Sequence, residues 1–248
     1  MSEAAAKLEH HGLPIAQVIP LKGMRKKIAE HMIHSHLTSA RVTSLHEIDV
    51  TEFVSLRNEL VKQPEKTGGV RISYTHLLIK AISQALRKHL ILNSTLVENE
   101  VLIFEDINIG MALTLPDGNL IVPVIHQADR KNIVEIAKRV SDLEERAKIG
   151  KLVVADVQKG TFTISNVGML PEARWFTPII NQGQCAILGT GAIRQAPLVK
   201  DGQIAIRWVI TTSLTHDHRI LNNGIVVEYF IQTLVQLVQD PQKIELGL

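Results

Sequence analysis

The segment 213–224, SLTHDHRILNNG, gathers side chains that could do chemistry together. It places two histidines, an aspartate, an arginine and two adjacent asparagines between two apolar runs. An imidazole titrates near neutral pH, so His218 could act there as a general base. The same residues also suit an ordinary turn from a strand into a helix, the corner 213–224, in which Asn222 or Asn223 caps the helix that follows. Because so many polar groups gather at one strand-to-helix junction, a functional role for this segment stays open beside the structural one.

A metal site is the first alternative for this segment. His216 and His218 are two residues apart, which would put both rings on one face of a continuing strand. Zinc needs a third and a fourth ligand, and no nearby cysteine, glutamate or histidine has a suitable spacing. We therefore predict no metal. Cys185 lies in an apolar run, CAIL, so we expect a buried structural thiol rather than a nucleophile.

Two further motifs stand where strands are predicted to end. TISNVG, residues 163–168, puts Ser165 and Asn166 just before a glycine. These side chains could make the local hydrogen bonds of a turn, or the serine hydroxyl could donate to negative charge that develops in a pocket. ILGTGAIRQ, residues 187–195, offers a GxG after a strand. It lacks the third glycine and the later acidic residue of a dinucleotide-binding fingerprint, so a nucleotide site is not predicted.

Composition excludes several classes of function. The 248 residues include 27 basic and 25 acidic side chains, well mixed, which gives no electrostatic case for nucleic acid or an anionic membrane. A single cysteine fits a reducing compartment. No apolar run reaches the roughly 20 residues of a membrane helix, and no signal-peptide pattern begins the chain. We expect a protein of the bacterial or archaeal cytoplasm, or of the mitochondrial matrix.

The elements that must position these residues follow from hydrophobic periodicity. Residues 1–18 are expected to be a linker or a tail left from cloning, and residues 19–248 one mixed-sheet α/β domain. A hairpin is expected at LPDGN, residues 115–119, and Asn132 with Glu135 should start a helix. Helices are predicted over 21–39, 74–90, 132–150 and 225–238, and a further one is predicted to start at Asp49 and Glu52 and to end before the loop that begins at Lys62. Strands are predicted over 41–50, 101–104, 107–115, 118–125, 160–165, 185–191 and 204–214.

Read together, the segments resemble the catalytic domain of dihydrolipoamide acyltransferases, the core components of 2-oxo acid dehydrogenase complexes. The resemblance runs from about residue 19 to the end of the chain, and 213–224 stands where the family has SLSxDHRxxDG. The other matching segments occur in the expected order: LKGMRKKIAEHM, EIDVTEFVSLR, KAISQALRKHLILN, INIGMALTLPDGNLIVPVI, GTFTISNVGML and FTPIINQGQCAILGTGAI.

The resemblance implies a chloramphenicol-acetyltransferase-like fold, with a mixed sheet and flanking helices. It implies a homotrimer that assembles into a larger cage, with each active site between two chains. Coenzyme A would enter from one side and a dihydrolipoyl arm from the other, and an acyl group would pass between their sulfurs. The implied partners are a lipoyl domain and the dehydrogenase and dihydrolipoamide dehydrogenase components of the complex. The lipoyl group would be carried on a separate or removed domain, because the tail is too short for one.

The resemblance also assigns roles to residues. His218 matches the family's general base, and Ser165 matches the serine that hydrogen-bonds the oxyanion. Asn222 replaces the signature's aspartate, which in the related fold pairs with an arginine of the opening helix, here Arg25. An amide oxygen can still accept from that arginine, without the ionic component. Three residues near Ser165 are expected along the substrate channel: Thr163, Asn166 and Gly168.

Two other functions stay open at this point. Asn222 and Asn223, in place of Asp-Gly, leave room for a structural core component with reduced or no catalysis. A second alternative is an acetyltransferase of the same fold that modifies a small hydroxylated molecule. The sequence does not define which acyl group, acetyl, succinyl, branched-chain or other, would be moved.

Overall fold

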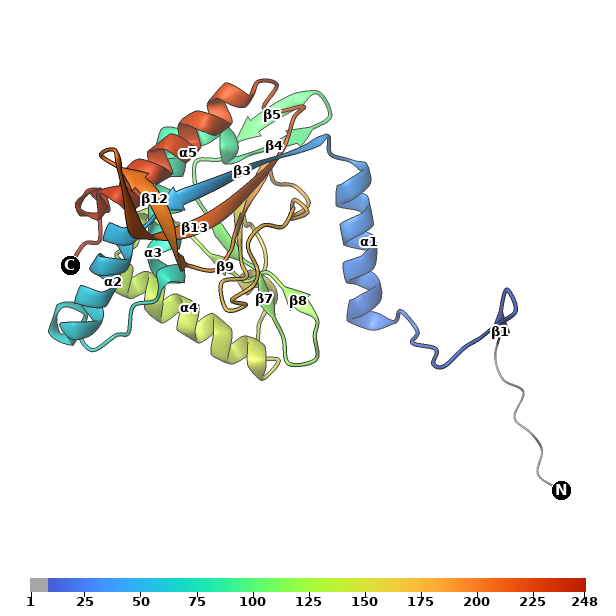
Figure 1. Cartoon of the computed structure of the whole chain (residues 1–248). Helices are drawn as coiled ribbons and strands as arrows, with labels where there is room; N and C mark the ends of the chain where they lie inside the picture. Colours follow the sequence, from blue (N-terminus) through green and yellow to red (C-terminus); the bar gives the residue numbers. More distant parts are fainter. Residues whose placement is uncertain (1–8) are drawn as a thin grey trace.

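The computed structural model describes residues 9–248, so the first eight residues of the expected tail lie outside it. Two short strands, β1 (Glu9–His10) and β2 (Leu13–Pro14), form a small hairpin. From residue 9 to residue 22 every residue except Ile15 is exposed, and this arm extends away from the rest of the molecule (Figure 1).

The main sheet has seven strands within residues 9–248 and is mixed. Its order is β12-β13-β11-β10-β6-β9, with β3 paired to the other edge of β13. β10 runs parallel to β11 and β6, and the remaining pairs are antiparallel. The strands are β3 (Arg41–Asp49), β6 (Ile109–Met111), β9 (Val124–Ile125), β10 (Phe162–Asn166), β11 (Ala186–Thr190), β12 (Arg194–Lys200) and β13 (Gln203–Asp217).

Strand β13 is longer than the sequence predicts. We expected a strand over 204–214, whereas pairing continues to Asp217 because β3 and β11 both extend along that end. Its first half pairs with β12, a strand that the sequence analysis missed. Lys200 pairs with Gln203 around the two-residue turn Asp201–Gly202, in which both residues have positive φ. Asp-Gly between apolar residues is a strong hairpin signal, so this strand could have been predicted.

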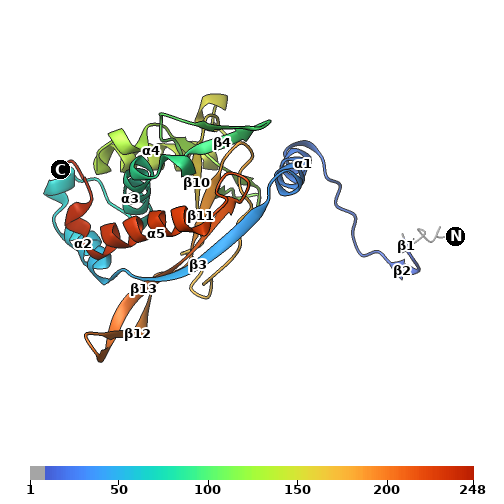
Figure 2. The ribbon, with the colours of Figure 1, turned by 90° about the horizontal axis from the view of Figure 1, so that it is seen from above.

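The helices form a layer on one face of the sheet (Figure 2). Helix α3 (Tyr74–Lys88) is buried along most of its length and packs against both α4 (Ile133–Lys148) and α5 (Gly224–Gln239). Phe162 of β10 meets Phe230 of α5, with ring centroids 5.9 Å apart. The capping box predicted at the start of α4 is present. Helix α2 (Thr51–Lys62) packs against α5 and β13.

Helix α1 (Gly23–Leu37) stands at the rim of the molecule, apart from the other helices (Figures 1 and 2). Its C-terminal part is tied to the body by Ser35, whose hydroxyl donates to the carbonyl of Ile180. Ile33 and Leu37 stay exposed.

Two hairpins complete the fold. β4 (Ser94–Val97) pairs with β5 (Glu100–Ile103), of which only β5 was predicted. β7 (Leu113–Thr114) pairs with β8 (Leu120–Ile121), which confirms the hairpin at residues 115–119. Each of the long strands predicted over 107–115 and 118–125 is therefore two short ones. Within residues 9–248, every helix is too short or too polar to cross a membrane.

The loop between β10 and β11 lies tightly against the sheet. A Cβ added at Gly189 would lie 2.8 Å from the ring of Phe176. A Cβ at Gly191 would collide with the carbonyl oxygen of Arg174 and with the hydroxyl of Thr211. Because these two glycines have no side chains, the β10–β11 loop can pack directly against β11. Gly189 pairs with Ser165 at the end of β10, so this packing lies beside Ser165.

Replacement of Gly191 by alanine should therefore destabilise the fold. The backbone and hydroxyl atoms around it cannot move freely, so we expect Gly191→Ala to lower the free energy of unfolding by about 1–3 kcal/mol in urea denaturation. Gly224→Ala is the control, because a Cβ there meets nothing within 4 Å and the residue begins a helix. Equal stabilities of the two variants would contradict the tight contact.

Candidate active site

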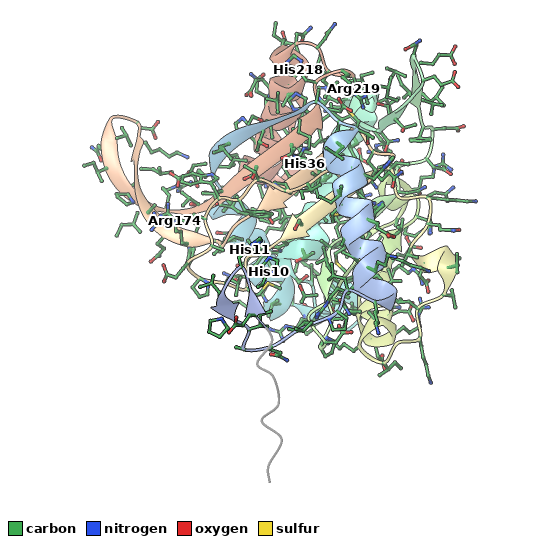
Figure 3. All side chains as sticks on the ribbon, turned by 90° about the vertical axis from the view of Figure 1, so that its right-hand side faces the viewer. His10, His11, His36, Arg174, His218 and Arg219 are labelled. Atoms are coloured by element: carbon green, nitrogen blue, oxygen red, sulfur yellow. The ribbon has the colours of Figure 1, made fainter. Side chains whose placement is uncertain are left out.

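His218 is the first residue after β13 and is held there by the strand pair. Its backbone N–H donates to the carbonyl of Ala40, 2.8 Å away, just before β3 begins. Its side chain is exposed in the single chain. Figure 3 shows His218 and Arg219 together near one end of α1. The paired strands β3 and β13 thus display an imidazole just beyond the end of β13.

Asp217, beside it, is a structural anion. Its carboxylate is 4% exposed and accepts from the Nε and Nη2 atoms of Arg219, the closest at 2.6 Å, and from the backbone N–H of Ala40 at 3.3 Å. Burial alone would raise the pKa of Asp217, but the hydrogen bonds from Arg219 outweigh it and lower the pKa below its usual range. Arg219 also donates to the carbonyl of Thr38 at the end of α1. The pair therefore fastens the end of β13 to α1.

His216 lies in the core rather than at the surface. It is 2% exposed, and neither ring nitrogen has a hydrogen-bond partner among the described residues. Its ring stacks on that of His218, with centroids 6.0 Å apart and planes 29° apart. Burial, and secondarily the charge of His218, lower the pKa of His216, while Asp217 opposes the shift. Across residues 9–248, no three histidine, cysteine, aspartate or glutamate side chains gather as a metal ion would require.

The two asparagines are exposed. Asn223 occupies the N-cap position of α5, as one interpretation of the corner predicts, but its side chain makes no capping hydrogen bond. Asn222 precedes it, close to the end of β13.

The expected contact between Arg25 and Asn222 is not formed within the described chain. Arg25 is in the first turn of α1, and Arg219 marks the other end of that helix. At 1.5 Å per residue, the 13 positions from Arg25 to Thr38 span about 20 Å. Arg25 lies instead near Asp117, whose pKa is lowered by hydrogen bonds from Asn119 and, to a smaller extent, by the arginine charge. What holds this corner in one chain is Arg219, which sequence reasoning did not single out.

Ser165 and His218 are far apart in one chain. Ser165 pairs with Gly189, which pairs with Ser213, so Ser165 lies two strands from β13 and five residues short of His218. Strand geometry makes that about 17 Å along the strands and about 10 Å across them, close to 20 Å in all. A base and an oxyanion donor at that separation cannot act on the same carbonyl.

The residues around Ser165 are ordered by local contacts. Asn166 accepts from the backbone N–H of Gly168 at 2.7 Å and donates to the hydroxyl of Thr75 at 3.0 Å. The first of these is the local turn bond that the sequence allowed. Thr163 is buried and donates to the side-chain oxygen of Gln184 at 2.7 Å. The Ser165 hydroxyl, in contrast to these neighbours, has no hydrogen-bond partner among residues 9–248.

The remaining sequence candidates are structural. Cys185 is fully buried, and burial raises the pKa of its thiol to about 12, which confirms an inert core thiol. The GxG at 189–191 is followed by strand β12 rather than by a helix, so it cannot form a dinucleotide-binding turn.

A cavity of about 390 Å³ beside the corner was not foreseen. The end of α1, the β4–β5 turn, residues 180–184 and the Asp217–Arg219 pair line it. These walls come from four separate parts of the chain, so no local pattern in the sequence announces the cavity.

Comparison with known proteins agrees with this geometry. Residues 14–246 match the family described as 2-oxoacid dehydrogenases acyltransferase (catalytic domain). The chain is 36% identical over 226 residues to the dihydrolipoyllysine-residue acetyltransferase component of the pyruvate dehydrogenase complex of Bacillus subtilis, covering 90% of this chain and 50% of that protein. It is 32% identical over 230 residues to the succinyltransferase component of the 2-oxoglutarate dehydrogenase complex of Haemophilus influenzae, covering 93% and 56%. The chain thus spans about half the length of the curated relatives it matches.

Solved structures show the same fold. A probable dihydrolipoamide acetyltransferase from Listeria monocytogenes superposes with a TM-score of 0.86 at 36% identity, covering 92% of this chain and 97% of that one. Chloramphenicol acetyltransferase, at 14% identity, has a TM-score of 0.52 over 90% of this chain and 99% of its own, which confirms the predicted fold.

The Azotobacter vinelandii dihydrolipoamide acetyltransferase has a TM-score of 0.88 at 29% identity, covering 98% of this chain and 99% of that one. Its crystallographic and enzymatic study concerns the role of a serine, a histidine and an asparagine in the catalytic mechanism. There the asparagine follows the histidine by four residues, as Asn222 follows His218. On its fold, its motifs and the match of nearly its whole length, this chain belongs to the acyltransferase (catalytic domain) family of the 2-oxoacid dehydrogenases.

Proposed function

We propose that the protein transfers an acyl group between a dihydrolipoyl thiol and coenzyme A, with His218 as general base and Ser165 as oxyanion donor. The observation that carries the proposal is the match of residues 14–246 to the acyltransferase catalytic-domain family. The strand register separates the two residues by about 20 Å in one chain, which bears on how the site is built. Because both must reach the same thioester, the serine comes from a second copy of the chain. Each active site then lies between two subunits of a homotrimer.

The chemistry needs few groups. A thiol is mostly protonated at neutral pH, and the thiolate is the nucleophile. His218 takes the proton from the sulfur of coenzyme A, and that sulfur attacks the carbonyl carbon of the acyl-dihydrolipoyl thioester. The Ser165 hydroxyl donates to the oxyanion that forms. The bond from carbon to the lipoyl sulfur then breaks, and the proton on His218 passes to the departing thiolate, so no acyl-enzyme is required.

The assembly and partners follow from the relatives. The cubic core of the pyruvate dehydrogenase multienzyme complex has a TM-score of 0.88 to this chain at 29% identity. We propose that trimers of this chain build a similar cage, served by lipoyl domains and by the dehydrogenase and dihydrolipoamide dehydrogenase components. Acetyl- and succinyl-transferring relatives are similarly close, so the proposal names the reaction rather than the acyl group. Bacterial relatives and a single buried thiol favour a reducing cytoplasm as the location.

The substrate channel is proposed around Ser165. Thr163, Asn166 and Gly168 lie on the same strand end and the turn after it. Thr163 donates to Gln184 and Gly168 donates to Asn166, and these bonds order the backbone on both sides of Ser165. We expect Asn222 to lie near the base as a neutral group. The Azotobacter relative has an asparagine at the same spacing after its histidine, which supports an active site that carries an asparagine at this position.

Mixed assemblies test the shared site. His218→Ala should lower kcat by about 10²–10⁴-fold, and Ser165→Ala by about 10²–10³-fold. Co-expression of the two variants should restore about a quarter of the wild-type activity, because random mixing pairs an intact histidine with an intact serine at one interface in four. The assay follows acyl transfer from acyl-dihydrolipoamide to coenzyme A.

Two controls separate the outcomes. The two variants mixed after separate assembly should stay inactive. If the co-expressed variants also stay inactive while assembling normally, the site is not shared between chains. If the wild type and His218→Ala are equally slow in acyl transfer, the chain is a scaffold rather than an acyltransferase.

The role of Asn222 is tested by Asn222→Asp. The Asp217–Arg219 pair already holds this corner, so an added carboxylate should change kcat by less than about tenfold. Asn223→Asp, at the neighbouring exposed position, is the control. A gain on the order of 10²-fold in Asn222→Asp alone would show that the natural asparagine weakens the site.

A further inference from the structure

The hairpin formed by β12 and the first half of β13 has an apolar face that is exposed within residues 9–248. Val199 pairs with Ile204 and Pro197 pairs with Ile206, so these four side chains lie on one face of the two-stranded ribbon. We call them the hairpin face. Val199, Ile204 and Ile206 are each at least 74% exposed. A contiguous apolar patch of this kind usually marks a surface that another molecule covers.

The opposite face of the same hairpin already has its partners. Ala196 is buried and Leu198 is half-buried. Arg207 donates to the carboxylate of Asp49 at 2.8 Å and lies 3.4 Å from that of Glu52 in α2. These contacts fix which face of the hairpin is turned outward. Figure 2 shows the hairpin projecting beyond the body of the molecule, so its outer face is open to a partner.

The position of the hairpin relative to Ser165 indicates what that partner is. Ser165 pairs with Gly189, which pairs with Ser213, so Ser165 is level with Ser213 of β13. β12 begins opposite Val209, which is four residues, or about 13 Å, further from His218. Along the strands, Ser165 therefore lies between the hairpin and the His218 end of its own chain.

The surface around His218 is a suitable counterpart. A site shared between copies puts His218 of one copy at Ser165 of the next, which brings the His218 end of one copy toward the hairpin end of the other. That end also exposes apolar side chains: Leu37 of α1, and Val42 and Leu45 of β3. We call these three the α1–β3 surface. In Figure 1 the hairpin and α1 lie on opposite sides of the molecule.

We propose that the hairpin face packs against the α1–β3 surface of a second copy of this chain, and that this contact brings Ser165 of one copy to His218 of the other. Because the contact joins two different patches, it is heterologous and repeats from copy to copy until the ring closes. Each contact then covers one hairpin face and completes one active site. The inference rests on the proposed function and adds to it the surface that assembles the shared site.

Charged substitutions on the hairpin face test the contact. Both side chains changed in Ile204→Lys/Ile206→Lys are exposed in the single chain, so its circular dichroism and urea denaturation should match the wild type. We expect association of the chains to weaken by at least about 100-fold, because lysines replace the apolar centre of the contact. Analytical ultracentrifugation should show single chains, and acyl transfer should fall in proportion to their fraction.

Two further variants make the test specific. Ile149→Lys/Val154→Lys is the matched control, because these apolar side chains are also exposed and lie on neither surface; it should assemble and react like the wild type. Leu37→Asp/Leu45→Asp changes the other surface and should dissociate as the hairpin variant does. Equal dissociation of the control, or normal assembly of Leu37→Asp/Leu45→Asp, would contradict the proposed pairing of surfaces.

Normal assembly with full activity in Ile204→Lys/Ile206→Lys would overturn the inference. If that variant does not fold, Ile204→Ser/Ile206→Ser takes its place, and normal assembly then has the same meaning. Co-expressed His218→Ala and Ser165→Ala separate the two proposals. Restored activity there, beside a hairpin variant that still assembles, refutes only this interface. A hairpin variant that dissociates, beside co-expressed chains that assemble but stay inactive, supports the contact and refutes the shared site.

Discussion

The pairing of β13 along both edges is the constraint on which the rest of the structure depends. β3 pairs with residues 209–217 and β11 with residues 212–216 on the other side, so the end of β13 cannot shift without breaking two ladders. A slip of one residue would turn the side chains of His216, Asp217 and His218 to the opposite faces of the sheet. The same register fixes Ser165 two strands away, facing Gly189. One strand therefore determines where the proposed base lies and how far it is from the proposed oxyanion donor of its own chain.

The charges at this corner obey a second constraint. A buried carboxylate is tolerated only when it is paired and hydrogen-bonded, and Asp217 meets that condition through Arg219 and the backbone of Ala40. Arg219 donates to the carbonyl of Thr38, so the ion pair joins Ser35 in anchoring the C-terminal end of α1 to the body. In the motif Asp-His-Arg, the aspartate and the arginine therefore bind each other rather than the histidine, and they fix the backbone on both sides of the proposed base.

Local signals in the sequence predicted most of the elements, and long-range geometry accounts for what they missed. Alternation and capping residues marked α3, α4 and β10 close to their observed bounds. The strand β12 was missed although Asp201–Gly202 announces its hairpin. The distance between Ser165 and His218 is a property of strand order and register, which no local pattern encodes. The burial of His216 likewise depends on two strands from other parts of the chain.

The contact between Asn222 and Arg25 that the resemblance implies stays a prediction, because it is not formed within the described residues of one chain. The resemblance placed Arg25 beside this residue, but α1 carries Arg25 about 20 Å from the end where the corner is anchored. The corner is held by the Asp217–Arg219 pair two to four residues away, inside the same chain. A carboxylate at position 222 would therefore find the nearby cation, Arg219, already paired with Asp217. The neutral amide at position 222 therefore leaves the ion pair that anchors this corner unchanged.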